Sequence, residues 1–139
     1  MMQNLQSVAS GAQQKSAIGL DGNLAAALGY PIGILGLVSA IIEKDNKFVK
    51  FHGFQSILWS IGMTIALVVV AIVLAILTMV IGSASGTLGM IFGLLTTLVY
   101  LGGFLLIFGG LIFAAIKAYQ GQMFKLPIVG NMAEKFALK

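Results

Sequence analysis

The side chains with the widest chemical repertoire are gathered in one short segment, residues 45–56. It holds the chain's single histidine, His52, with basic and aromatic residues around it and the polar pair Gln55 and Ser56 behind it. The histidine has no second ligand or carboxylate beside it, and the chain has four acidic residues and no cysteine. These counts leave no thiol nucleophile, paired carboxylates or histidine–carboxylate constellation. We therefore expect no enzymatic activity, no metal and no cofactor.

Two interpretations of this segment remain open. In the first it is an interfacial loop, with lysines at lipid head groups, phenylalanines at the acyl boundary, and Gln55 and Ser56 satisfying the groups of a helix end. In the second it is a docking surface for a protein partner or a lipid head group. Both place the segment at the edge of a membrane.

The C-terminal tail is predicted to form a second short amphipathic element. Gly121 can end a long helix and Pro127 can begin a new one. Beyond Pro127, apolar residues recur at helical spacing opposite polar ones; the apolar set is Ile128, Val129, Met132 and Phe136, and the polar set is Asn131, Glu134 and Lys135. This helix is expected either to lie flat in the cytoplasmic leaflet or to pack against the first loop.

Three long apolar runs carry these segments: Leu24–Ile42, Ile57–Ile81 and Thr87–Ile116, none of which contains a charged residue or a histidine. Only 9% of the chain is charged, against roughly 25% in soluble domains. As helices the runs would measure about 28, 37 and 45 Å, enough to cross a hydrocarbon core of about 30 Å. The third is too short for two crossings. The sequence therefore predicts an all-α, polytopic transmembrane protein with three spans.

Lysine positions predict the orientation. Lysines follow the first and third runs, whereas the turn Gly82–Gly86 has none. Three spans place these lysines on one side, so the positive-inside rule predicts an external N-terminus and a cytoplasmic C-terminus in a prokaryotic cytoplasmic (inner) membrane. The parts expected are a polar N-terminal segment at 1–22, a membrane domain at 23–118 and a cytoplasmic amphipathic tail at 119–139.

Glycine spacing indicates close helix packing. Gly29 with Gly33, and Gly89 with Gly93, form small-residue pairs one turn apart, which allow helix backbones to approach. The contact could be internal or with another chain. No ionisable group lies within the runs, which argues against a coupled transporter or pump.

Two motifs together resemble a known family. The stretch Lys47–Ser56 and the tail motifs at 118–121 and 126–130 are similar to those of DUF4870 membrane proteins, also described as Tic20-like, with Lys50 where the family usually has arginine and Gly53 where it usually has alanine. The resemblance covers about residues 20–135. It implies an interaction surface formed by the matching positions Lys50, Phe51, His52, Gln55, Ser56, Gly121, Pro127 and Gly130.

The functional expectation is a non-enzymatic accessory or scaffold subunit of a larger membrane complex. Its expected partners are membrane lipids and other integral membrane proteins, with a homo-oligomer as a further possibility. Nucleic acid is excluded, because the lysines form no aromatic-interleaved basic patch. The alternative is a Tic20-like component of protein translocation or a homo-oligomeric pore.

Overall fold

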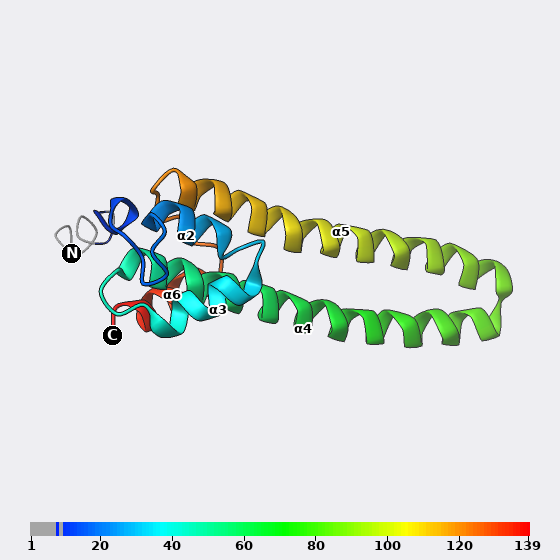
Figure 1. Ribbon diagram of the computed structural model, residues 1–139. Helices are drawn as coiled ribbons and strands as arrows, with labels where there is room; N and C mark the ends of the chain where they lie inside the picture. Colours follow the sequence, from blue (N-terminus) through cyan, green and yellow to red (C-terminus); the bar gives the residue numbers. More distant parts are fainter. Residues whose placement is uncertain (1–7, 9) are drawn as a thin grey trace. The chain divides into compact units, whose positions relative to one another are not determined.

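The protein is all-α, as the apolar runs predicted. The computed structural model describes residue 8 and residues 10–139 (Figure 1). Over these residues no strand forms beyond an isolated bridge between Lys15 and Asp21. The elements are η1 (Gly11–Gln13), α2 (Gly22–Leu28), α3 (Gly33–Ile42), α4 (Lys47–Ala84), α5 (Gly86–Tyr119) and α6 (Val129–Ala137). They divide into two units: the chain up to Ser60 together with Gly109–Lys139, and Ile61–Phe108.

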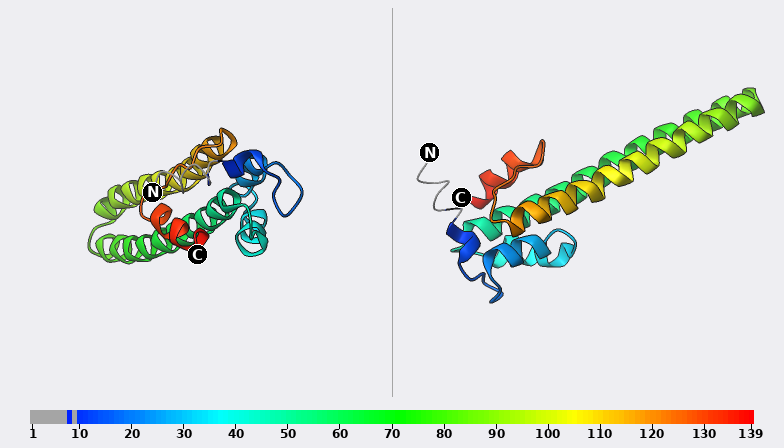
Figure 2. Two further views of the ribbon diagram at one scale, coloured as in Figure 1. Left: turned by 90° about the vertical axis from the view of Figure 1, so that its left-hand side faces the viewer. Right: turned by 90° about the horizontal axis from the view of Figure 1, so that it is seen from above.

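The second unit, Ile61–Phe108, contains only the facing parts of α4 and α5, which run side by side in opposite directions (Figure 2). A single residue, Ser85, separates the two helices, which confirms the tight turn expected near Gly82–Gly86. The most apolar 18-residue stretch of α4 has 0% of its residues buried, and that of α5 has 11%. A core helix of a soluble protein would bury such a stretch. Both helices are therefore candidates for crossing a membrane.

Small and hydroxylated residues join α4 to α5 within this unit. A Cβ on Gly89 would lie 2.5 Å from the Gly82 Cα, so the backbones touch there. Nearby, the hydroxyls of Thr78 and Thr96 are 3.2 Å apart, and the Tyr100 hydroxyl donates to a backbone carbonyl of α4 at 3.0 Å. Such contacts satisfy polar groups without water, as a lipid environment requires.

In the first unit, the run Leu24–Ile42 does not form the single helix that was expected. It forms α2 and α3 with a break at residues 29–32, because Pro31 lacks a donor N–H and cannot continue a regular helix. At about 1.5 Å per residue the two helices are about 10 and 15 Å long, well short of a bilayer core. The chain then turns back: a Cβ on Gly29 would lie 3.2 Å from the Gly36 Cα.

The segment before α2 packs onto the segment after α3. The Asn46 side-chain amide donates to the carbonyl of Gly11 at 2.7 Å, and the N–H of Ala17 donates to the Glu43 carboxylate at 2.8 Å. These bonds hold both ends of the α2–α3 hairpin together. The expected boundary at residue 22 is thus the start of α2, but the residues from Gly11 onward belong to the same folded unit.

The chain leaves α5 through the glycine that the sequence predicted. Gly121 has φ +73°; its N–H donates to the Ala118 carbonyl, and the N–H of Gln122 donates to the Lys117 carbonyl, both at 2.9 Å. This paired pattern is a Schellman motif, which glycine favours. The tail helix α6 then begins at Val129, two residues beyond Pro127.

Candidate functional site

The predicted surface residue Gln55 is the centre of a buried polar cluster in the first unit. Its side-chain N–H groups donate to the Tyr30 hydroxyl at 2.7 Å and to the Phe124 carbonyl at 2.9 Å. Its side-chain oxygen accepts the N–H of Leu126 at 3.0 Å. One side-chain amide therefore pairs with the backbone of the tail much as a neighbouring strand would, and attaches that segment to α4.

His52 extends this cluster on α4. Its Nδ1 lies 2.8 Å from the Tyr30 hydroxyl, so a neutral imidazole that accepts there leaves the hydroxyl free to accept from Gln55. The rings of Tyr30, Phe48 and Phe51 stand edge-on around the imidazole at 4.5–5.8 Å. Aromatic rings therefore enclose the imidazole, and His52 is fully buried.

A second polar cluster caps α4. The Asn46 side-chain oxygen accepts the Val49 N–H at 3.2 Å, which makes Asn46 the N-cap of the helix. The Glu43 carboxylate accepts the Asn46 N–H at 3.3 Å while it also accepts the N–H of Ala17. Both side chains are buried. The sequence did not predict the bonds from these two side chains to Ala17 and Gly11, because those partners lie 26 and 35 residues away.

The structure places most residues of the predicted interaction surface inside the first unit. Phe51, His52, Gln55 and Ser56 are buried, and Gly130 is buried beneath them: a Cβ there would lie 3.0 Å from the Gln55 side-chain oxygen. Among the other predicted positions, Lys50 and Gly121 are half-buried and Pro127 is exposed. The two motifs do meet, but as an internal contact that attaches the tail to α4. Their side-chain chemistry is used for folding.

The predicted packing glycines have unequal roles. Gly29 and Gly89 stand at close backbone contacts, Gly93 is in ordinary contact with Thr78, and Gly33 faces open space. Spacing alone missed other close glycine positions in the first unit. A Cβ on Gly53 would lie 2.7 Å from the Gly36 carbonyl oxygen, so α3 and α4 cross almost backbone to backbone.

We expect stability to fall in mild acid. His52 precedes the exposed apolar stretch of α4; burial lowers its pKa from 6.5 to about 3, against a smaller opposing effect of the Gln122 backbone. The unfolded chain binds a proton near pH 6.5 and the folded chain does not, so this contribution is present above pH 6.5 and is lost progressively as the pH falls towards 3. At pH 5 the loss is about 2 kcal/mol.

Thermal unfolding in detergent at pH 7.5 and pH 5 measures this effect. The variant His52→Gln should unfold at nearly the same temperature at both pH values, whatever its own stability. An equal pH dependence in the two proteins would contradict the assignment to His52.

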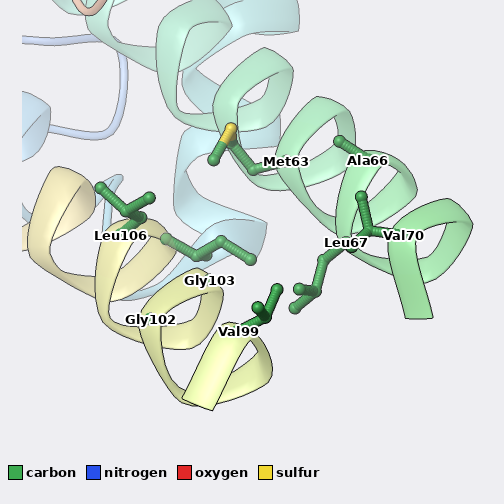
Figure 3. A pocket seen from close by; sticks show the side chains of 9 residues that line it. Met63, Ala66, Leu67, Val70, Val99, Gly102, Gly103 and Leu106 are labelled. Carbon is green, nitrogen blue, oxygen red and sulfur yellow. The ribbon is translucent and has the colours of Figure 1, made fainter. Parts of the chain in front are cut away.

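The second unit has an open apolar groove of about 370 Å³ between α4 and α5 (Figure 3). Met63, Leu67 and Val70 line it from α4, and Val99 and Leu106 from α5. Two glycines of α5 also line it: Gly102 faces open space, whereas the Leu67 side chain lies against Gly103. The groove suits a hydrocarbon group, either a lipid chain or a side chain of another membrane helix.

Comparison with known proteins identifies similar chains. Residues 15–133 match the family described as the magnetosome magnetite crystal formation protein family. A UPF0132 membrane protein of Methanocaldococcus jannaschii is 38% identical over 88% of this chain and 94% of its own length. A UPF0132 membrane protein of Archaeoglobus fulgidus is 32% identical over 81% of this chain and 92% of its own length. No solved structure matches.

These matches overturn the resemblance to DUF4870 and Tic20-like proteins, which was wrong. The family that matches and the curated relatives carry other descriptions, and neither supports a relation to those proteins. What the relatives do share with the expectation is that they are membrane proteins.

Proposed function

The chain belongs to the magnetosome magnetite crystal formation protein family, and we propose that it is a non-enzymatic accessory or scaffold subunit of a larger membrane complex. In this proposal the hairpin of α4 and α5 crosses the membrane. The groove between α4 and α5 receives a helix of an unlike membrane protein.

The groove is the observation that carries this proposal. Large apolar side chains cover the outer faces of α4 and α5, but Gly102, on the groove, faces open space. Without a water-driven hydrophobic effect, membrane helices associate through close packing at such small-residue positions. A concave surface with an apolar lining therefore supports a packing role more than a chemical one.

The carboxylates also support a structural role. Asp21 pairs with Lys15 at 2.9 Å and Glu134 with Lys125 at 2.7 Å, while Glu43 is buried with two backbone N–H groups. Three of the four acidic side chains are thus engaged in holding the fold. The family description refers to magnetite crystal formation, whereas the archaeal relatives are described only as membrane proteins. A scaffold role is compatible with both descriptions.

The proposal includes a topology with two crossings. Bonds from Asn46 and Glu43 to the segment before α2 support placing both ends of the α2–α3 hairpin on one side of the membrane. The α2–α3 hairpin would then begin and end on the same side of the membrane without crossing it. The competing topology has three crossings, with the run Leu24–Ile42 passing through and an external N-terminus.

Single-cysteine labelling distinguishes the two topologies, and the chain has no native cysteine to interfere. With two crossings, an impermeant maleimide applied to intact cells should label Ser83→Cys but leave Gln13→Cys, Lys44→Cys and Lys139→Cys unlabelled until the cells are opened. Labelling of Gln13→Cys together with Ser83→Cys from outside would instead establish three crossings.

Site-specific photocrosslinking tests the subunit role. A photoreactive residue at Leu106, on the groove, should crosslink to an unlike membrane protein, whereas the same residue at the exposed Met79, outside the groove, should crosslink mainly to lipid. Lipid adducts alone at both positions would contradict the proposal. Adducts only to a second copy of the chain would favour the homo-oligomeric alternative.

A homo-oligomeric pore stays a prediction with less support. A water-filled pore needs a polar lining, and the large exposed side chains of the second unit are hydrocarbons. The hydroxyl of Thr97, which is exposed there, donates to the Gly93 carbonyl of its own helix at 2.9 Å.

A further inference from the structure

The tail helix α6 has a face that the fold leaves uncovered. Its small residues Gly130, Ala133 and Ala137 are buried in the first unit, and the last two pack with Phe51 of α4. Of the two expectations for this helix, the structure shows the packing against the rest of the chain. It does pack near the first loop, through its small residues, and its large apolar residues are left pointing elsewhere.

Those large residues form one stripe. Ile128 is 85% exposed, and Met132 and Phe136 are each 45% exposed. Met132 and Phe136 lie four residues apart in α6 and therefore share one side of the helix, and Ile128 directly precedes the helix. The Phe136 ring also lies 5.5 Å from the ring of Phe54, so the stripe continues onto the surface of α4. This is a continuous apolar surface.

The backbone favours an apolar setting for the stripe. Ile128 has φ +68° and ψ −60°, a conformation that a β-branched residue rarely adopts. The N–H of Val129 donates to the Pro127 carbonyl at 2.8 Å and closes this turn. In water, this turn is unfavourable because its backbone is strained and because the isoleucine side chain is exposed. Burial of that side chain in an apolar environment offsets the cost of its exposure.

Charge identifies the occupant of this face. Asn131 and Lys135 lie on the exposed side of α6 away from Phe136, and Lys125 is paired with Glu134. Within residues 10–139, Lys135 and Lys139 take part in no ion pair. An apolar stripe bordered by unpaired lysines is complementary to a leaflet that contains anionic lipid.

The first turn of α4 supports the same occupant independently. Lys47 and Lys50 stand there, at the positive end of the helix macrodipole, where a cation is disfavoured. An external anion offsets that repulsion, whereas the helix itself does not. Lipid head groups supply such anions beside a membrane helix.

The contacts that hold α6 lie within the first unit. It packs against the part of α4 that contains Phe51, Phe54 and Leu58.

We propose that α6 docks its Ile128–Met132–Phe136 stripe into the interface of an anionic lipid leaflet, with Lys135 and Lys139 at the head groups. The tail is then fixed on two sides, by α4 through its small residues and by lipid through its large ones. This inference does not depend on the scaffold role, because it concerns only the contact of the first unit with its own membrane.

Spin labels on single-cysteine variants of the full chain test the docking. The variants are Met132→Cys, on the stripe, and its neighbour Asn131→Cys, on the polar side, each reconstituted in phosphatidylcholine with and without phosphatidylglycerol. At position 132 the accessibility to oxygen relative to a water-soluble nickel chelate should be severalfold higher than at position 131. Phosphatidylglycerol should widen this difference.

The lysines provide the second measurement. In the Met132→Cys protein, Lys135→Gln and Lys139→Gln should each reduce the preference for phosphatidylglycerol by about fivefold, the equivalent of about 1 kcal/mol per lysine. Equal accessibilities at positions 131 and 132 would overturn the proposal. So would a label at position 132 that neither reagent reaches, because that result means protein covers the stripe.

Discussion

Gln55→Ala is expected to release the C-terminal tail from α4. The substitution leaves the Phe124 carbonyl and the Leu126 N–H without their partner and removes a donor from the Tyr30 hydroxyl. Buried groups left without a hydrogen bond cost about 1–3 kcal/mol each, so we expect a loss of about 3 kcal/mol or more in the free energy of unfolding. Gln55 is 0% exposed, which prevents water from replacing the bonds.

Limited proteolysis in detergent measures this release. Residues 122–139 should be cut much faster in the variant, while the α4–α5 hairpin remains resistant. Gln120→Ala is the matched control, because that glutamine is exposed on the same tail and should leave the rate unchanged. Gln55→Glu separates the two halves of the contact: its carboxylate can still accept from Leu126 but cannot donate to Phe124. Cleavage of all three variants at the wild-type rate would show that Gln55 does not hold the tail.

Gly36→Val is expected to separate α3 from its neighbours. A Cβ at this position would meet the Ser56 side-chain oxygen and would lie 2.6 Å from the Gly29 carbonyl oxygen. Backbone atoms cannot move aside as a flexible side chain can, so valine must displace α3 as a whole. Overpacking of this kind typically costs about 1–3 kcal/mol, and we expect the upper end of that range.

Gly33→Val is the control for this prediction. The two glycines lie three residues apart on the same short helix, but no atom lies within 4 Å of a Cβ placed on Gly33. The two variants therefore have the same intrinsic helix propensity and differ in their surroundings. Thermal unfolding should separate them clearly, with Gly33→Val close to the wild-type protein. Similar melting temperatures for the two would mean that α3 does not pack at Gly36 as described.

The sequence identified the two long helices well, because hydropathy is a local property. The run Ile57–Ile81 lies inside α4, and Thr87–Ile116 lies inside α5. The turn before Gly86 and the glycine end of α5 were also predicted, because both depend on residues adjacent in the chain. The start of α4 was not: it begins at Lys47, so most of the expected first loop is helical. The run Leu24–Ile42, in contrast, forms two short helices, α2 and α3.

The reason lies in contacts that hydropathy does not measure. Pro31 was recognised as a kink, but whether the chain continues in the same direction or turns back depends on what receives Tyr30 and Gly36. The Tyr30 hydroxyl is held by His52 and Gln55, and Gly36 is pressed against α4. These contacts with α4 stabilise the reversal of the chain between α2 and α3. A local sequence pattern does not show them, because the partners lie elsewhere in the chain.

The paired motifs show the same division. The lysine-based orientation placed the first loop and the tail on one side of the membrane, where they could meet. Whether they form an exposed surface or an internal contact could not be decided from the chain, since Gln55 meets Phe124 and Leu126 across 69 and 71 residues. Polar residues at a membrane edge are compatible with either outcome.

The sequence by itself determined that this is an all-α membrane protein with two long apolar helices, because a lipid environment selects for composition and length over each segment separately. Only the tertiary structure decided that the first apolar run is a short hairpin, that the polar motif is buried, and that α6 keeps its large apolar residues exposed. Those features depend on which side chains meet across the fold. Such meetings are set by close packing and by the pairing of buried polar groups.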